Sequence, residues 1–165
     1  MLNMNPNEGY LSCCFTGHRN VPPQSADAIR YTLERLIYEL YENGCREFIS
    51  GGAIGFDTIA AETVIKFKKM FPEIRLIMAL PCRDQHIKWG KVDRLRYEKL
   101  LSLADKVIYL TERYVTGCMH LRNKYMVDNS DLCIAYFENK GGGTEYTINY
   151  AREQGRKVVN IAHML

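Results

Sequence analysis

The sequence has no long hydrophobic run, and this absence excludes one class of protein. None of its apolar stretches approaches the roughly 18 residues that are needed to span a bilayer. Residues 1–9, MLNMNPNEG, also lack the basic segment followed by an apolar one that marks a secretory signal. We therefore expect a cytoplasmic protein with no membrane partner, in which residues 1–9 form a flexible N-terminus.

The cysteines lack any metal-binding or disulfide spacing. No CxxC pair occurs among positions 13, 14, 45, 82, 118 and 133, and three of these six lie inside apolar runs. This usage is typical of buried thiols in a reducing compartment. The sequence thus predicts no metal site and no bound cofactor.

A strong charge of one sign is also missing. The 22 Lys and Arg residues against 19 Asp and Glu residues give a net charge of +3. Nucleic-acid-binding domains usually have a sharper basic bias, so an anion site must depend on the local placement of residues. The length of 165 residues suits one domain that supports its own core.

What the sequence does have is a regular alternation of strand-like and helix-like segments. Short apolar runs predict strands over 11–16, 46–50, 75–80, 106–110, 132–137 and 157–161. Apolar residues at helical spacing predict helices over about 26–42, 56–67, 88–104, 118–129 and 144–154. This alternation predicts an α/β fold: a Rossmann-like three-layer sandwich with a mostly parallel sheet of about six strands, in a single domain over 10–165.

Two details of these helices are specific enough to test. Ser25 is expected to be the N-cap of the first helix. The helix over 88–104 is expected to turn one apolar face inward, formed by Val92, Leu95, Leu100 and Leu103.

The loop after the first strand is a candidate ligand-binding segment, because open α/β sheets bind ligands beyond the carboxyl ends of their strands. It holds Thr16, Gly17, His18 and Arg19. Gly17 permits a tight exit from the strand, and His18 or Arg19 would meet an anion. The alternative is that Arg19 is a solvated surface charge and His18 anchors the loop.

The loop after the second strand is rich in glycine and begins at Ser50. Gly51 and Gly52 would let the backbone approach a ligand closely, and Gly55 would let the following helix pack near its strand. Asp57 would accept a ribose hydroxyl or cap the helix. The pattern is neither a GxGxxG nor a Walker sequence, so its position between strand and helix carries the prediction.

Further candidates lie in two later loops. Gly142, Gly143 and Thr144 enter the last helix and would form a phosphate cradle with a hydroxyl donor, or else a flexible surface turn. Trp89 follows the third strand and would either stack on a base or pack as core.

The helix over 118–129 contributes a candidate cation, Arg122. Met119, Arg122 and Met126 share one helical side. An arginine among apolar residues binds phosphate or carboxylate bidentately, or else forms a structural salt bridge.

Taken jointly, these motifs resemble the SLOG superfamily, which groups DNA-processing protein A with the lonely-guy (LOG) phosphoribohydrolases, and above all its YpsA-like branch. The resemblance covers about residues 10–162. It rests on Thr-Gly-His-Arg at 16–19, Ser-Gly-Gly-Ala-x-Gly-x-Asp at 50–57, Leu-Pro with Gln85 and Trp89, Arg-Asn-x-x-Met-x-x-x-Ser-Asp at 122–131, and Gly-Gly-Gly-Thr at 141–144. It implies a Rossmann-like fold whose glycine loops hold a nucleotide or a related ligand.

The LOG resemblance implies two candidate catalytic residues, Arg122 and Glu145. Arg122 falls in a match to the LOG Met-His-x-Arg-Lys motif, in which Asn123 replaces the lysine. The LOG glutamate aligns with Thr147. Glu145 lies nearby, but on a helix it points roughly 200° away from that position.

Three functions stay open. The leading interpretation is a module that binds a nucleotide or nucleotide-derived phosphate ligand without turnover, for example as a sensor. The first alternative is a nucleotide N-glycoside hydrolase that uses Asp57, Glu145 or Asp131 as its acid. The second alternative, by analogy with DNA-processing protein A, is single-stranded DNA binding with a salt-dependent affinity.

A homo-oligomer is also expected, because the LOG resemblance implies dimers. The first helix offers a row of tyrosines for such an interface, although the row would equally suit a half-exposed helix face. These tyrosines are Tyr31, Tyr38 and Tyr41.

Overall fold

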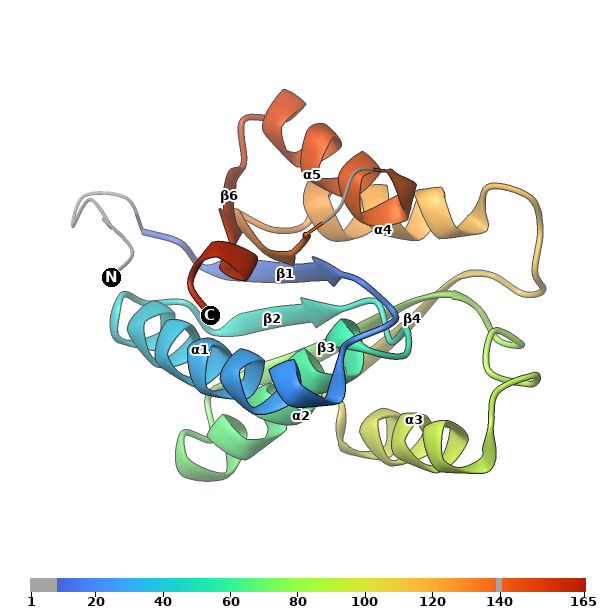
Figure 1. Ribbon diagram of the computed structural model, residues 1–165, viewed down its shortest axis with the longest axis horizontal. Coiled ribbons are helices and arrows are strands. Elements are labelled where there is room, and N and C mark those ends of the chain that lie inside the picture. Colours follow the sequence, from blue (N-terminus) through green and yellow to red (C-terminus); the bar gives the residue numbers. More distant parts are fainter. Residues whose placement is uncertain (1–8, 139–140) are drawn as a thin grey trace.

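Short apolar segments with buried side chains form a parallel sheet at the centre of the molecule (Figure 1). The computed structural model describes residues 9–138 and 141–165, so most of the segment predicted to be a flexible N-terminus lies outside the described residues. The strands are β1 (Ser12–Gly17), β2 (Glu47–Ser50), β3 (Arg75–Cys82), β4 (Lys106–Thr111), β5 (Leu132–Tyr136) and β6 (Lys157–Asn160). They are ordered β4-β3-β2-β1-β5-β6, and every pairing is parallel.

Helices cover both faces of this sheet and complete a three-layer sandwich. They are α1 (Pro23–Glu42), α2 (Phe56–Met70), α3 (Lys91–Leu103), α4 (Cys118–Asp128) and α5 (Gly142–Glu153), followed by a short 3-10 helix, Ile161–His163. Figure 1 shows α1, α2 and α3 on one face and α4 and α5 on the other. The predicted Rossmann-like α/β fold is confirmed.

Successive side chains of the central strand β1 pack alternately into two separate hydrophobic cores. Cys13 and Phe15 point into the larger core beneath α1 and α2, whereas Cys14 points into the smaller core beneath α4 and α5. This follows from the two-residue period of a strand, which places successive side chains on opposite faces. All three side chains have no exposed surface.

The order of the strands creates a crevice at one edge of the sheet. The chain builds outward from β1 to β4 and then returns to place β5 on the other side of β1. The connections that leave β1 and β5 therefore run in opposite directions, and ligands of open α/β sheets bind at such a switch point.

The six cysteines are all buried and none forms a disulfide, as the sequence predicts. Cys14 and Cys133 are direct register partners in β1 and β5. Burial raises the pKa of the Cys45 thiol to about 12. Among the described residues, no helix is both long and apolar enough to cross a membrane.

The predicted start of the first helix is wrong by three residues. Pro22 is the N-cap and Pro23 is the first helical residue, while Ser25 lies inside the first turn. Proline suits the first helical position because its φ is already helical and the N–H it lacks has no partner there.

The predicted inward face of α3 is confirmed at Leu100 and wrong at its other three positions. Tyr97 and Leu100 are its buried residues, whereas Val92, Leu95 and Leu103 are 71%, 56% and 38% exposed. The ring of Tyr97 stacks on His86 at 4.7 Å and packs edge-on against Trp89 at 5.3 Å. This aromatic cluster, and not the aliphatic stripe, determines which side of α3 faces the protein.

We predict that truncating the two leucines of α3 will have unequal effects on stability. Leu100→Ala should lower the free energy of unfolding by about 2–5 kcal/mol, because it leaves a cavity in the core. Leu95→Ala should change it by less than about 0.5 kcal/mol, because its side chain lies in solvent. Urea unfolding followed by circular dichroism measures both, and equal losses would contradict the observed orientation of α3.

Candidate anion-binding site

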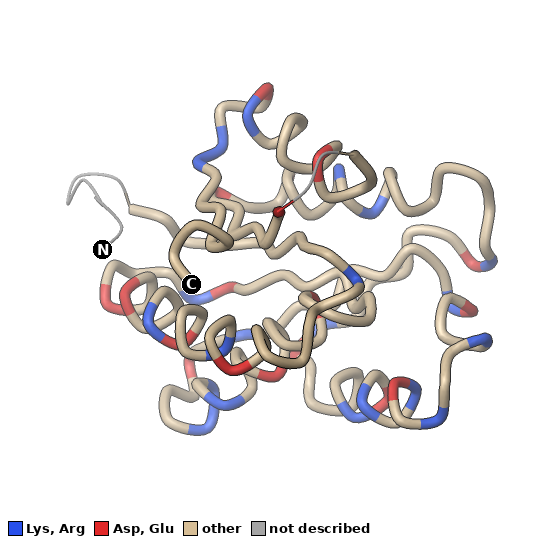
Figure 2. The backbone as a smooth tube through the Cα atoms, viewed as in Figure 1, with Lys and Arg blue, Asp and Glu red and all other residues tan. Residues whose placement is uncertain are grey.

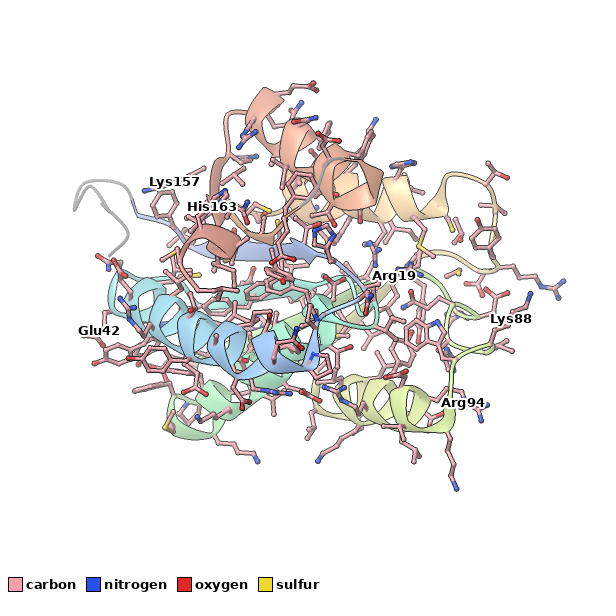
Figure 3. The ribbon with its side chains drawn as sticks, viewed as in Figure 1. Arg19, Glu42, Lys88, Arg94, Lys157 and His163 are labelled. Atoms are coloured by element: carbon pink, nitrogen blue, oxygen red, sulfur yellow. The ribbon has the colours of Figure 1, made fainter. Side chains whose placement is uncertain are left out.

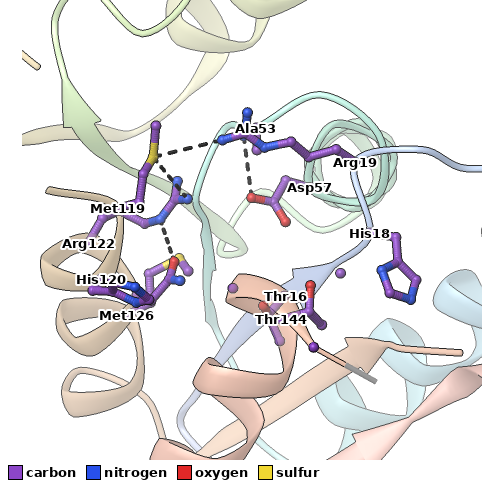
Figure 4. A pocket seen from close by; sticks show the side chains of 15 residues that line it. Thr16, His18, Arg19, Ala53, Asp57, Met119, His120, Arg122, Met126 and Thr144 are labelled. Atoms are coloured by element: carbon purple, nitrogen blue, oxygen red, sulfur yellow. Dashed lines mark hydrogen bonds between the residues drawn. The ribbon is translucent and has the colours of Figure 1, made fainter. Parts of the chain in front are cut away.

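A cavity of about 410 Å³ opens at the carboxyl edge of the sheet, where the connections from β1 and β5 diverge (Figure 4). Its walls come from the loop after β1, the loop after β2, the inner side of α4 and the start of α5. The lining residues are Thr16, Gly17, His18, Arg19, Ala53, Asp57, Met119, His120, Arg122, Asn123, Met126, Gly141, Gly142, Gly143 and Thr144.

Most of the sequence-predicted site residues meet at this cavity, although their segments are far apart along the chain. The predicted residues that do not line it are Ser50, Gly51, Gly52, Gly55, Trp89 and Glu145. Lining residues absent from the predicted set are Ala53, Met119, His120, Met126 and Gly141. The helical spacing that marked Arg122 also marks Met119 and Met126, so this pattern was the available signal for them.

Arg122 is the buried cation of the cavity, with only 5% of its surface exposed. Its Nη1 donates to the carbonyl of Gly51, and its Nε donates to Oδ1 of Asn123 at 2.7 Å. Burial lowers its pKa, an effect that exceeds the opposing influence of Asp57. Among the described residues, no carboxylate forms an ion pair with this guanidinium.

Asp57 is the buried acid of the cavity, and it is also 5% exposed. Its Oδ2 accepts a hydrogen bond from the amide of Ala53 at 3.3 Å. Burial raises its pKa and outweighs the lowering effects of Arg122, the Ala53 N–H and Arg19. Burial therefore dominates at both Asp57 and Arg122, as expected for two buried charges that are not in direct contact.

Arg19 brings a second positive charge to the same end of the cavity. Figure 3 shows it where β1 ends, and Figure 4 shows its guanidinium converging with that of Arg122 on one methionine. Arg19 Nη2 lies 3.8 Å from the Met119 sulfur, and Arg122 Nη2 lies 3.9 Å from it. Like charges repel, so this arrangement favours an anion between or beside the two side chains.

The loop after β2 holds Arg122 and Asp57 from behind. A Cβ at Gly51 would lie 2.5 Å from Arg122 Nη1 and 2.7 Å from Asp57 Oδ2, so a side chain there would displace both charged groups. Gly55 has a positive φ of 83° and packs against the carbonyl of Arg19. Ser50 Oγ donates to the backbone carbonyl of Asp57 at 3.0 Å. These contacts place the loop as a support for the cavity wall.

The start of α5 presents a glycine-lined helix N-terminus to the cavity. Gly141 and Gly142 have positive φ values of 95° and 84°, and the N-cap has no side-chain hydrogen bond of its own. Free amide groups and the helix dipole both favour an anion at such an end. Thr144, which is 9% exposed, lines the cavity one turn further on.

The acids proposed for hydrolysis lie in very different places. Glu145 Oε2 accepts a hydrogen bond from the Gly141 amide at 2.6 Å, which holds it against the loop and off the cavity wall. Thr147, at the position of the LOG glutamate, is fully buried and donates to the carbonyl of Gly143. Asp131 accepts hydrogen bonds from the amides of Leu11 and Ser12, at the opposite edge of the sheet. Among the described residues, Asp57 is the only acid that lines the cavity.

Two other predicted site residues have structural contacts. His18 Nε2 accepts a hydrogen bond from the Glu138 amide at 3.0 Å, and its ring packs on Tyr136 and Phe137. It therefore lines the cavity while also anchoring the loop. Trp89 packs against Tyr97 and the larger core, away from the cavity. Within 9–138 and 141–165, no group of three His, Cys, Asp or Glu side chains is arranged to hold a metal ion.

Together, the sheet and cavity define a Rossmann-like α/β protein with a basic, glycine-lined cavity at its topological switch point. The YspA SLOG family model matches residues 13–164, and the chain belongs to this family. It is 35% identical over 129 residues to UPF0398 protein BH1768 of Halalkalibacterium halodurans, covering 76% of this chain and 68% of that protein. It is 32% identical over 139 residues to the SPbeta prophage-derived protein YoqJ of Bacillus subtilis, covering 77% of this chain and 80% of that protein.

Solved structures support the same fold at lower identity. DNA processing protein A from Helicobacter pylori, whose structure was described for its single-stranded DNA binding, superposes with a TM-score of 0.64 at 24% identity. The match covers 90% of this chain but only 63% of that one. TM1055 superposes with a TM-score of 0.55 at 16% identity, covering 89% and 71% of the two chains. These likenesses establish the fold alone.

We predict that the buried carboxyl of Asp57 makes stability fall as pH rises. Its pKa in the folded protein lies above the usual 3.8. The stabilisation is therefore complete below about pH 3.8 and is lost as pH rises through the folded pKa. Asp57→Asn removes this dependence, so its free energy of unfolding should increase relative to wild type from about pH 4 to neutral pH. Urea unfolding across this range tests it, with the exposed Asp27→Asn as control; parallel profiles for wild type and Asp57→Asn would contradict it.

Proposed function

We propose that the cavity binds a phosphate-bearing nucleotide or nucleotide-derived ligand, with its phosphate between the start of α5 and the guanidinium of Arg122. The observation that carries this proposal is a buried arginine that no carboxylate pairs with in the described part of the chain. Leaving such a charge buried is costly, and a bound anion would offset much of that cost. A ligand sensor without turnover fits this chemistry.

The remaining walls supply polar groups that suit a phosphate and a sugar. Thr16, Asn123 and Thr144 are 6%, 7% and 9% exposed. Among the described residues, the hydroxyls of Thr16 and Thr144 and the Asn123 amide nitrogen have no hydrogen-bond partner. All three residues line the open cavity, so these groups are available to a polar ligand in place of water. The volume of about 410 Å³ falls in the range of small-molecule sites.

We predict that removing either arginine weakens nucleotide binding. Arg122→Ala should raise the Kd for a ribonucleoside 5′-monophosphate by roughly 10- to 100-fold, as expected for loss of a charge-assisted hydrogen bond. Arg19→Ala should raise it less, because Arg19 is exposed and better screened. Isothermal titration of the four monophosphates measures both effects.

One control variant and a second use of Arg19→Ala make this experiment decisive. Arg94 is an exposed arginine on α3 that lies away from the cavity, so Arg94→Ala is the matched control. Arg19→Ala covers the case in which the buried Arg122→Ala variant does not fold. Wild-type affinity in every cavity variant that folds would contradict the proposal.

Hydrolysis of a nucleotide N-glycosidic bond is a second candidate function, and the position of Asp57 favours it. A carboxyl with a raised pKa on a cavity wall is suited to act as a general acid for the departing base. If the protein is such an enzyme, it should release free base steadily, and Asp57→Asn should lower the rate by roughly 100-fold or more. Chromatography of monophosphate incubations measures the release; no release from wild type would leave binding without turnover.

Single-stranded DNA binding is a third proposal, taken from the Helicobacter pylori neighbour. It would require a basic groove and a steep salt dependence. Figure 2 shows Lys and Arg interleaved with Asp and Glu along α1 and α3, which does not favour DNA binding.

A dimer is likewise a proposal. Helix α1 offers Tyr31 and Tyr38 for its interface, and these side chains are 66% and 47% exposed. A cytoplasmic location stays an expectation.

A further inference from the structure

One side of the cavity mouth is aromatic. His120, an exposed residue of α4, lines the cavity on the side that faces α5. Its imidazole packs against the ring of Tyr146 on α5, with 4.1 Å between ring centroids and 60° between planes. The charged groups of Arg19 and Arg122 lie elsewhere on the wall, so the cavity has a cationic part and an aromatic part (Figure 4).

The aromatic part is supported from behind. Tyr146 lies parallel to Tyr150, with centroids 6.5 Å apart and planes at 2°. Tyr150 is held by a hydrogen bond from its hydroxyl to Asp128 Oδ1 at 2.9 Å, and the ammonium of Lys124 lies 5.3 Å from its ring. Tyr146 is therefore packed between two rings, and this restricts the positions available to His120.

The imidazole of His120 has no competing role in the fold. Within the described residues it makes no hydrogen bond, whereas His18 accepts one from the Glu138 amide. Two soft, polarisable side chains, Met119 and Met126, line the cavity nearby. A flat ring with an exposed face, beside methionines and next to an anion site, suits a planar heterocycle.

We infer that His120, supported by Tyr146, stacks on the nucleobase of the ligand. This inference rests on the proposed function and deepens it: the ligand would be a nucleotide that carries its base, and not a free phosphate or a sugar phosphate. Every base has a π-face, so the stack would strengthen binding without selecting strongly among bases.

The test compares ligands with and without a base. Adenosine, guanosine, cytidine and uridine 5′-monophosphates and ribose 5-phosphate are titrated into the full chain by calorimetry. His120→Ala should weaken nucleotide binding by about 5- to 10-fold, at the lower end expected for a stacked base, and leave ribose 5-phosphate unchanged. His120→Phe keeps a ring and should retain nucleotide affinity. Leu121→Ala, an exposed neighbour that does not line the cavity, should match wild type.

The other possible results contradict either the stacking inference or the proposed function. Equal weakening of ribose 5-phosphate and nucleotides by His120→Ala would overturn stacking, as would a His120→Phe variant as weak as His120→Ala. Equal wild-type affinities for ribose 5-phosphate and the nucleotides, unaffected by His120→Ala, would overturn the stacking inference while the anion site stands. If wild type binds none of the five compounds, the proposed function fails and this inference fails with it.

Discussion

The buried guanidinium of Arg122 is the constraint on which the rest of the site depends. Its charge is kept from water inside a protein that, among its described residues, gives it no carboxylate ion pair. The surrounding structure compensates with neutral acceptors, the Gly51 carbonyl and the Asn123 side chain. Gly51 must lack a side chain for this contact to form, because a Cβ would fall on both the guanidinium and Asp57. The glycine-rich loop thus makes room for a charge, and the charge in turn creates a preference for an anion.

Topology brings the parts of this site together. β1 and β5 are neighbours in the sheet although more than a hundred positions separate them along the chain. The loop after β1 supplies Arg19, the start of α5 supplies free amide groups, and α4 supplies Arg122 from the helix that precedes β5. Because both loops leave the same edge of the sheet in opposite directions, the cavity between them is not filled by either connection. The cavity is therefore a consequence of the strand order, and its positive character comes from the residues placed on it.

Much of this arrangement could be predicted from the sequence, and the exceptions have physical reasons. The strands were predictable because each is a short apolar run, and these runs alternate regularly with segments of helical periodicity. The role of the glycines after β2 was harder to predict, because the lack of a side chain suits a ligand contact and close packing equally well. In the structure, Gly51 packs against the Arg122 side chain and Gly55 packs against the Arg19 backbone. The exposure of the aliphatic residues of α3 depends on which side of this helix faces the protein, and Tyr97 determines that side through its contacts with His86 and Trp89 in the preceding loop. Periodicity alone does not contain that information.

The start of α5 has features that suit an anion, but it lacks the acid that LOG enzymes use for hydrolysis. Gly141 and Gly142 adopt conformations that expose the helix N-terminus, and the Gly141 amide is satisfied by the carboxylate of Glu145. That hydrogen bond stabilises the turn that opens α5, and it also keeps the carboxylate from reaching into the cavity. Thr147, where the LOG family places its acid, turns its hydroxyl back to the helix backbone. The turn can therefore suit an anion and still lack the LOG acid. Among the described acids, Asp57 alone lines the cavity and could assist hydrolysis, and its burial favours its protonated form.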